Sequence, residues 1–303
     1  MNKLFLSSLL TLMCVGGWAQ NDLAGYEYSS TVSAPTGNEW QNPEQLSLNK
    51  EQPTAYMFHF ASEKEAENVV AESSPYYRTL KGVWKFSWVA SPELRPMDFY
   101  RTDYDDSGWD DIEVPGCWNV QGLQKDGSMK YGVPIYVNQP VIFFHEVKVG
   151  DWKKGVMRKA PDNWTVSKYP NEVGSYRRTF SIPKEWKGRQ VFLNFDGVDS
   201  FFYLWINGKY IGFSKNSRNT ASFNITPYII KGDNVVAVEV YRSSDASMLE
   251  SQDMFRLPGI IRDVYITATP EISISDLVVR TDSLISGGKA IVSIDAKGRS
   301  HGR

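Results

Sequence analysis

Two polar side chains stand beside strong turn signals and have the chemistry to bind a sugar. Asn138 lies between Pro134 and Pro140, and its amide both donates and accepts hydrogen bonds. Asp245 lies in a serine-rich stretch directly after an apolar run and offers a carboxylate. Sugar hydroxyls also donate and accept, so the two side chains suit neighbouring hydroxyl groups. The same residue types cap local turns, and residue chemistry alone leaves both interpretations open.

No familiar catalytic or metal-binding pattern occurs in the sequence. There is no GxSxG motif, no glycine-rich phosphate loop and no HExxH motif. The histidines, His59, His145 and His301, lack the spacing of metal ligands. The formal net charge is −2 and the basic residues are scattered. This balance gives no electrostatic reason to expect a nucleic acid or an anionic membrane as a partner.

The elements that must position the two side chains are short strands. Aromatic residues, which favour strands, make up 14% of the chain. Runs of β-branched and aromatic residues alternate with turn-forming residues, which predicts an all-β antiparallel sandwich or jelly roll. Asn207-Gly208 predicts a two-residue hairpin turn, and only residues 61–72 predict a helix. The expected strands span residues 83–88, 175–182, 190–196, 201–206, 210–213, 234–241 and 261–268.

The first 55 residues differ in composition from the rest. Residues 1–19 combine a basic start, an apolar stretch and small residues at the end, which is typical of a secretory signal peptide. The apolar stretch is too short to serve as a membrane anchor, so we expect export to the periplasm or the outside of the cell. Residues 20–55 are polar and rich in turn signals, which predicts an extended N-terminal arm.

The remainder divides into one large domain and the beginning of another. Residues 56–268 hold the predicted jelly roll, interrupted by a polar, lysine-rich insertion at residues 145–172 that we interpret as a long loop or an extra hairpin. After Pro270 the strand pattern starts again. An immunoglobulin-like sandwich takes about a hundred residues, so we expect residues 269–303 to be the truncated start of such a domain.

The residues around Asn138 and Asp245 follow a distinctive order, Pro134-Ile135-Tyr136-Val137-Asn138 and Ser244-Asp245-Ala246-Ser247-Met248-Leu249-Glu250-Ser251-Gln252-Asp253-Met254. Leu204-Trp205-Ile206-Asn207-Gly208 and Gly259-Ile260-Ile261-Arg262-Asp263-Val264 are also distinctive. Together they resemble the N-terminal sugar-binding domain of glycoside hydrolase family 2, in particular its bacterial β-galactosidases. The similarity runs from about residue 38 to residue 303.

The resemblance implies a galactose-binding-like jelly roll followed by an immunoglobulin-like sandwich. It implies a complete enzyme that hydrolyses terminal non-reducing β-D-galactose residues of β-galactosides with retention of configuration. Asn138 and Asp245 match positions that hold galactosyl hydroxyls, and the position of Asp245 also contacts sodium. The neighbouring residues are expected to fix the loop instead of binding ligand; they are Glu250, Gln252, Asp253 and Arg256.

The resemblance also implies parts that have no counterpart in this sequence. The two catalytic glutamates of the family lie on a (β/α)₈ barrel that follows the immunoglobulin-like domain, and retaining hydrolysis needs them about 5 Å apart. Without that barrel, no catalytic residue is expected in this portion, which should be inactive alone. Magnesium, sodium and assembly as a homo-oligomer are implied for the complete enzyme.

Two alternatives remain open at the level of the sequence. A jelly roll also suits a free-standing carbohydrate-binding module without catalysis, because the fold alone does not specify the function. Another specificity within the family, such as that of a β-glucuronidase, would share the more general motifs.

Overall fold

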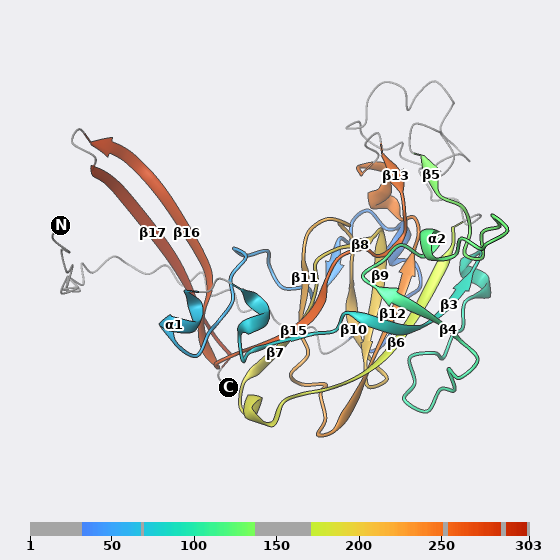
Figure 1. Cartoon of the computed structure of the whole chain (residues 1–303), viewed down its shortest axis with the longest axis horizontal. Helices are drawn as coiled ribbons and strands as arrows, with labels where there is room; N and C mark the ends of the chain where they lie inside the picture. Colours follow the sequence, from blue (N-terminus) through green and yellow to red (C-terminus); the bar gives the residue numbers. More distant parts are fainter. Residues whose placement is uncertain (1–31, 68–69, 137–170, 251–253, 286–288, 302–303) are drawn as a thin grey trace.

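Two antiparallel sheets pack face to face, and a separate hairpin projects from them at the C-terminal end (Figure 1). The computed structural model describes residues 32–67, 70–136, 171–250, 254–285 and 289–301. The predicted signal peptide at residues 1–19 and nearly all of the predicted insertion at residues 145–172 lie outside the described residues. The prediction of an all-β fold is confirmed.

The larger sheet has seven strands in the order β1-β10-β9-β12-β6-β3-β4, and the smaller has four in the order β11-β7-β15-β2. The strands are β1 (Ser47–Leu48), β2 (Tyr77–Thr79), β3 (Gly82–Val89), β4 (Asp110–Val114), β5 (Ile135–Tyr136), β6 (Val173–Ser181), β7 (Gln190–Phe195), β8 (Val198–Asp199), β9 (Phe201–Ile206), β10 (Lys209–Ser214), β11 (Ala221–Asn224), β12 (Asp233–Tyr241), β13 (Phe255–Arg256), β14 (Gly259–Ile260), β15 (Val264–Thr269), β16 (Ile272–Ile285) and β17 (Lys289–Ser300).

Helices are few and short. The α-helices are α1 (Glu63–Ala66) and α2 (Trp118–Gln121), and the 3-10 helices are η1 (Glu39–Gln41), η2 (Ala71–Ser73), η3 (Pro92–Leu94), η5 (Lys184–Trp186) and η6 (Asp245–Met248). Within the part of the chain that the structure describes, no helix is long and apolar enough to span a bilayer.

The helix predicted over residues 61–72 is wrong in its extent. Among the described residues of this range, α1 is the α-helix, Val70 has extended backbone angles, and the 3-10 helix η2 begins after it. None of the residues of α1 is buried. Most helical stability in proteins comes from packing of one face, so this segment lacks what would sustain a longer helix.

The predicted strands appear with small shifts at their ends. The exception is the last one: Gly259–Ile260 pairs with β8 as the separate strand β14, and β15 starts at Val264. The predicted hairpin turn is confirmed: Asn207 and Gly208 have φ angles of 51° and 79°. Two positive φ angles are the signature of a type I′ turn, which connects β9 to β10 with Trp205 opposite Tyr210.

The main hydrophobic core lies between the two sheets. Alternate residues of a strand point to opposite faces, so β9 contributes Phe202, Leu204 and Ile206 to this core. They pack with residues of the smaller sheet such as Leu193 and Phe223, which are fully buried.

A second apolar cluster covers the outer face of the larger sheet. The other residues of β9, Phe201, Tyr203 and Trp205, belong to it. Trp40 of the N-terminal segment stacks on Tyr241 of β12, with ring centroids 5.3 Å apart. All six residues of β9 are therefore buried, because chain segments outside the sandwich cover the face that would otherwise meet water.

One buried carboxylate lies on this outer face. Glu239 of β12 is 3% exposed, accepts a hydrogen bond from Tyr241 Oη at 2.9 Å, and lies 3.2 Å from Arg95 Nε. Burial raises the pKa of Glu239 to about 7, and the charge of Arg95 only partly opposes the shift.

We expect Glu239 to make the protein less stable as the pH rises from about 4.5 to 7. The folded state holds a proton that the unfolded state has already lost in that range, and the effect amounts to roughly 3 kcal/mol. The Glu239→Gln variant should lose this part of the pH dependence in urea unfolding followed at several pH values. An unchanged slope would show that Glu239 is ionised throughout the range.

Candidate functional site

Asp245 begins the short helix η6, shortly after the central strand β12 ends. Ser244 caps this helix: its side chain accepts a hydrogen bond from the backbone of Ser247, and its own N–H donates to Ser247 Oγ at 3.0 Å. Ser200 donates to Ser244 Oγ at 3.2 Å, which ties the loop to the residue before β9. The backbone that carries the Asp245 carboxylate is therefore held from two sides.

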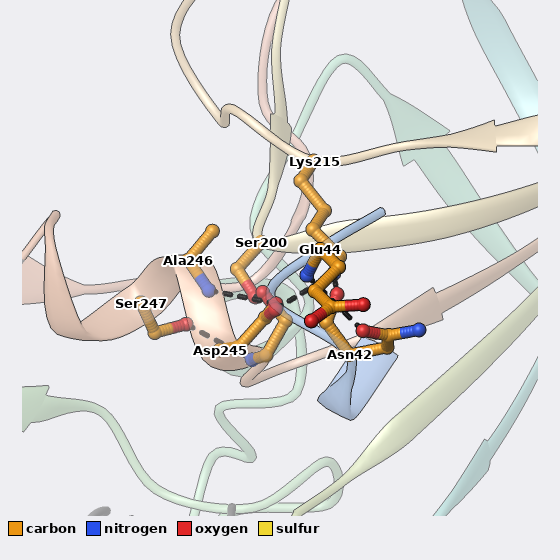
Figure 2. A network of polar contacts seen from close by, with 8 residues as sticks. Asn42, Glu44, Ser200, Lys215, Asp245, Ala246 and Ser247 are labelled. Carbon is orange, nitrogen blue, oxygen red and sulfur yellow. Dashed lines mark hydrogen bonds and ion pairs between the residues drawn. The ribbon is translucent and has the colours of Figure 1, made fainter. Parts of the chain in front are cut away.

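Both oxygens of Asp245 already have protein partners. Oδ1 accepts the N–H of Ala246 at 2.9 Å, and Oδ2 accepts a hydrogen bond from Lys215 Nζ at 2.8 Å. Lys215 Nζ also donates to the carbonyl of Asn42 at 2.7 Å. Figure 2 shows the Lys215 side chain reaching in between Asn42 and Asp245. The Lys215 ammonium group thus links the N-terminal segment to the loop of Asp245.

The ion pair between Lys215 and Asp245 is almost fully buried, with 2% and 4% of the side chains exposed. Burial raises the pKa of Asp245, and Lys215 opposes that shift. Burial also lowers the pKa of Lys215, and Asp245 opposes this. Each charge thus reduces the cost of burying the other.

A second buried ion pair supports the same loop. Arg242 Nη1 lies 2.7 Å from Glu172 Oε1, and Arg242 Nη2 donates to the carbonyl of Val133 at 2.7 Å. Asn171 donates to the carbonyl of Ser243 at 3.1 Å and accepts the N–H of Ser243 at 2.8 Å. These contacts join the end of β12, the start of β6 and the segment that leads to β5.

Gly132 permits the close approach of Glu172. A Cβ atom at this glycine would lie 2.1 Å from Glu172 Oε1, and its φ of +69° is in the left-handed region. Trp118 Nε1 donates to Glu172 Oε2 at 3.4 Å. A larger residue at position 132 would displace the carboxylate that pairs with Arg242.

The strand that precedes Asn138 pairs with the strand that follows the loop of Asp245. Strand β5 pairs with β13, with Tyr136 opposite Phe255 and Ile135 opposite Arg256. Asn138 itself lies outside the described residues, two positions beyond β5. Its predicted contact with a sugar therefore stays a prediction, as does that of Asp245.

Glu250 makes the kind of contact expected of a residue that fixes the loop. Its carboxylate accepts the N–H of Ser217 at 2.7 Å and the hydroxyl of Ser217 at 2.5 Å. Arg256 is 5% exposed, and its charge acts on the buried Asp199. Gln252 and Asp253 lie outside the described residues.

Lys215 is the site residue that the sequence did not reveal. It follows β10, 30 residues before Asp245, in a stretch without a recognisable motif. Lysine in a polar segment is normally solvated, so the residue type gave no signal of burial.

Asp245 by itself does not make a sodium site. Alkali and alkaline-earth cations prefer several oxygen ligands, and Asp245 offers one carboxylate whose oxygens both accept hydrogen bonds. Among the described residues, no group of three or more acidic, histidine or cysteine side chains could hold a metal ion. The sodium contact predicted for Asp245 stays a prediction.

A cavity of about 130 Å³ lies away from this loop. Residues after the N-terminal arm, the smaller sheet and the base of the β16–β17 hairpin line it, among them Phe58, His59, Asn194 and His301. Neither Asp245 nor Lys215 borders it, so the cavity is not part of the candidate site.

Comparison with known proteins identifies the family of this fold and loop. The profile described as "Glycosyl hydrolases family 2, sugar binding domain" matches residues 77–270, which include both sheets except β1. The chain belongs to glycosyl hydrolase family 2. As the sugar-binding domain of a family 2 hydrolase, the sandwich has a carbohydrate as its expected ligand.

Two similar proteins of family 2 are named beta-galactosidases. The chain is 37% identical over 274 residues to a beta-galactosidase of Priestia megaterium, covering 89% of this chain and 25% of that protein. It is 38% identical over 204 residues to a beta-galactosidase of Halalkalibacterium halodurans, covering 67% of this chain and 18% of that protein. The chain thus spans a quarter or less of these two family 2 relatives.

Solved structures of family 2 share the fold. A calcium-binding mutant of Bacteroides uniformis beta-glucuronidase 2 superposes with a TM-score of 0.52 at 24% identity, covering 74% of this chain and 22% of that one. At this identity the similarity shows the fold alone.

We expect that breaking the buried pair of Arg242 and Glu172 destabilises the family 2 domain far more than breaking an exposed pair does. The Arg242→Met variant leaves Glu172 buried without its cation and should lose about 3–5 kcal/mol of unfolding free energy. Arg280→Met is the matched control, because Arg280 pairs with Asp295 at a similar 2.6 Å but with 60% and 62% of the side chains exposed.

Urea unfolding of both variants measures the difference. The control should change the unfolding free energy by less than about 1 kcal/mol. Equal losses in the two variants would show that the burial of the Arg242 pair does not determine its contribution.

Proposed function

We propose that the chain is the N-terminal, sugar-binding part of a β-galactosidase that hydrolyses terminal non-reducing β-D-galactose residues with retention. In this proposal Asp245, and with it Asn138, contacts galactosyl hydroxyls. The observation that carries the proposal is the Asp245 carboxylate, which is held on a capped loop beside a buried lysine. The chain that contains it is 37% identical to a beta-galactosidase over 89% of the residues of this chain.

The contacts of Asp245 suit this role chemically. A carboxylate has about four acceptor positions, and two of them are filled by Ala246 N–H and Lys215 Nζ. The remaining lone pairs can accept hydrogen bonds from sugar hydroxyls, and a charged acceptor makes these bonds stronger than a neutral one does. Because the capped loop is already ordered, sugar binding does not carry the entropic cost of ordering it.

The chemical step belongs to other residues in this proposal. A retaining glycosidase uses two carboxyl groups about 5 Å apart, one as nucleophile and one as acid and base. In the proposal these two groups lie on a barrel domain, as the family resemblance implies, so Asp245 would bind and orient the sugar without taking part in bond cleavage. The complete enzyme is proposed to use magnesium and sodium, which would supply electrostatic stabilisation when bound, and to be exported through residues 1–19.

A β-glucuronidase is the second candidate within the family, favoured only by the shared fold. A glucuronide carries its own carboxylate, which would face the negative charge of Asp245. Among the described residues, Asp245 pairs with the cation of Lys215, whose charge the pair already balances. The described surroundings of Asp245 therefore suit a neutral galactoside better than an acidic sugar.

The Asp245→Asn variant of the complete protein should lose transition-state binding. A hydrogen bond to a charged group contributes about 1.5–3 kcal/mol, so we expect kcat/KM for a chromogenic β-galactoside to fall roughly tenfold to a hundredfold. The same assay on the chain of 303 residues alone should show no hydrolysis.

Asp263→Asn is a suitable control, because Asp263 also pairs with a lysine, Lys81, but at a partly exposed site. It should leave the kinetics unchanged. Normal kinetics of Asp245→Asn would refute the role of Asp245, and hydrolysis by the chain alone would refute the assignment of catalysis to another part of the protein. Faster hydrolysis of a β-glucuronide than of a β-galactoside would favour the second candidate.

A further inference from the structure

Lys215 is buried at a position where a lysine is costly. Only 2% of its side chain is exposed, and its ammonium group has left water for two oxygen partners. Removing an ammonium ion from water costs several kcal/mol, and an ion pair often only balances that cost. An apolar side chain could fill the same space, so general stability gives a weak reason for a lysine here.

The two partners of Lys215 come from distant parts of the chain. Oδ2 of Asp245 lies 2.8 Å away and belongs to the loop after β12, whereas the carbonyl of Asn42 lies 2.7 Å away in the N-terminal segment, 173 residues earlier than Lys215. The ammonium group therefore fixes the carboxylate relative to a second, independently held element.

That second element is itself firmly anchored. Trp40 stacks on Tyr241, and Tyr203 Oη donates to Glu39 Oε2 at 2.6 Å. The backbone N–H of Lys215 also donates to the carbonyl of Leu46 at 3.1 Å. The Asn42 carbonyl is thus held near Lys215 by contacts on both sides of it in the sequence.

We propose that Lys215 is a positioning residue for the sugar contact at Asp245. It holds one carboxylate oxygen in place and leaves the other lone pairs of Asp245 directed to the ligand, while the Asn42 carbonyl holds the ammonium. The inference rests on the proposed function, because it assigns a role to Lys215 only through Asp245.

A compact ammonium suits this task better than a guanidinium does. Arginine would present a planar fork that pairs with both oxygens of a carboxylate at once and so competes with the ligand. Lysine is a point charge with donors in several directions, and it can contact one oxygen of Asp245 and the Asn42 carbonyl together.

A double-mutant cycle in the complete protein tests the proposal. Lys215→Met keeps most of the length of the side chain but removes the charge and the donors, and should lower kcat/KM for a chromogenic β-galactoside roughly tenfold or more, as misplacement of a binding group does. In the Asp245→Asn background the same substitution should have little further effect, because the two residues act as one unit. Lys81→Met is the matched control, since Lys81 pairs with Asp263 at 2.6 Å with 38% and 37% of the side chains exposed; it should leave the kinetics unchanged.

The outcomes separate failure of this inference from failure of the proposed function. The role of Lys215 would be overturned if Asp245→Asn lowered kcat/KM and Lys215→Met did not, or if the two losses simply added in the double variant. Either result would leave the proposed function standing. Unimpaired Asp245→Asn would overturn the proposed function and the role of Lys215 with it.

A measurement that does not depend on enzymatic turnover tests the contact between Lys215 and Asp245. In the chain labelled with ¹³C at aspartate carboxyl groups, an NMR titration should show a higher pKa of Asp245 in Lys215→Met, because the opposing cation is gone. An unchanged pKa of Asp245 would contradict the contact. Should Lys215→Met not fold, Lys215→Gln keeps a donor without the charge, and it should raise the pKa of Asp245 while retaining part of the activity.

Discussion

The larger sheet has two apolar faces, and only one of them can pack against the smaller sheet. The strand β9 shows the constraint most clearly, because all six of its residues are buried. Its inner face forms the core between the sheets, and its outer face needs a cover of its own. Trp40 supplies part of that cover, which places the N-terminal segment along the sheet and near the end of β12.

The candidate site depends on this cover. Because the N-terminal segment is fixed over the sheet, the Asn42 carbonyl can accept a hydrogen bond from Lys215 Nζ. The same ammonium group donates to Asp245. The pair of Arg242 and Glu172 holds the other side of the same loop. Two buried ion pairs therefore hold this loop, Lys215 with Asp245 and Arg242 with Glu172. Each pair links the chain just after β12 to a segment distant in sequence.

The strand pattern could be predicted in detail because it is a local property. Alternating or continuous apolar runs bounded by turn residues specify where strands form, and Asn207-Gly208 specifies its own turn. The helix expected over residues 61–72 failed for the converse reason: its residues favour a helix locally, but no residue of α1 is buried against the fold. Tertiary packing, which the local pattern does not contain, decides how far such a helix extends.

The sequence by itself determined the all-β class, most strand positions, the hairpin turn, and the motif around Asp245 that carries the resemblance to family 2. Only the tertiary structure showed that Asp245 is buried against Lys215, that the Asn42 carbonyl completes the contact, and that β5, which precedes Asn138, pairs with β13, which follows the loop of Asp245. Strand propensities and turn types depend on neighbours a few residues apart. The surroundings of a buried charge depend on segments as far as 173 residues apart, and only the packed sheets bring those segments together.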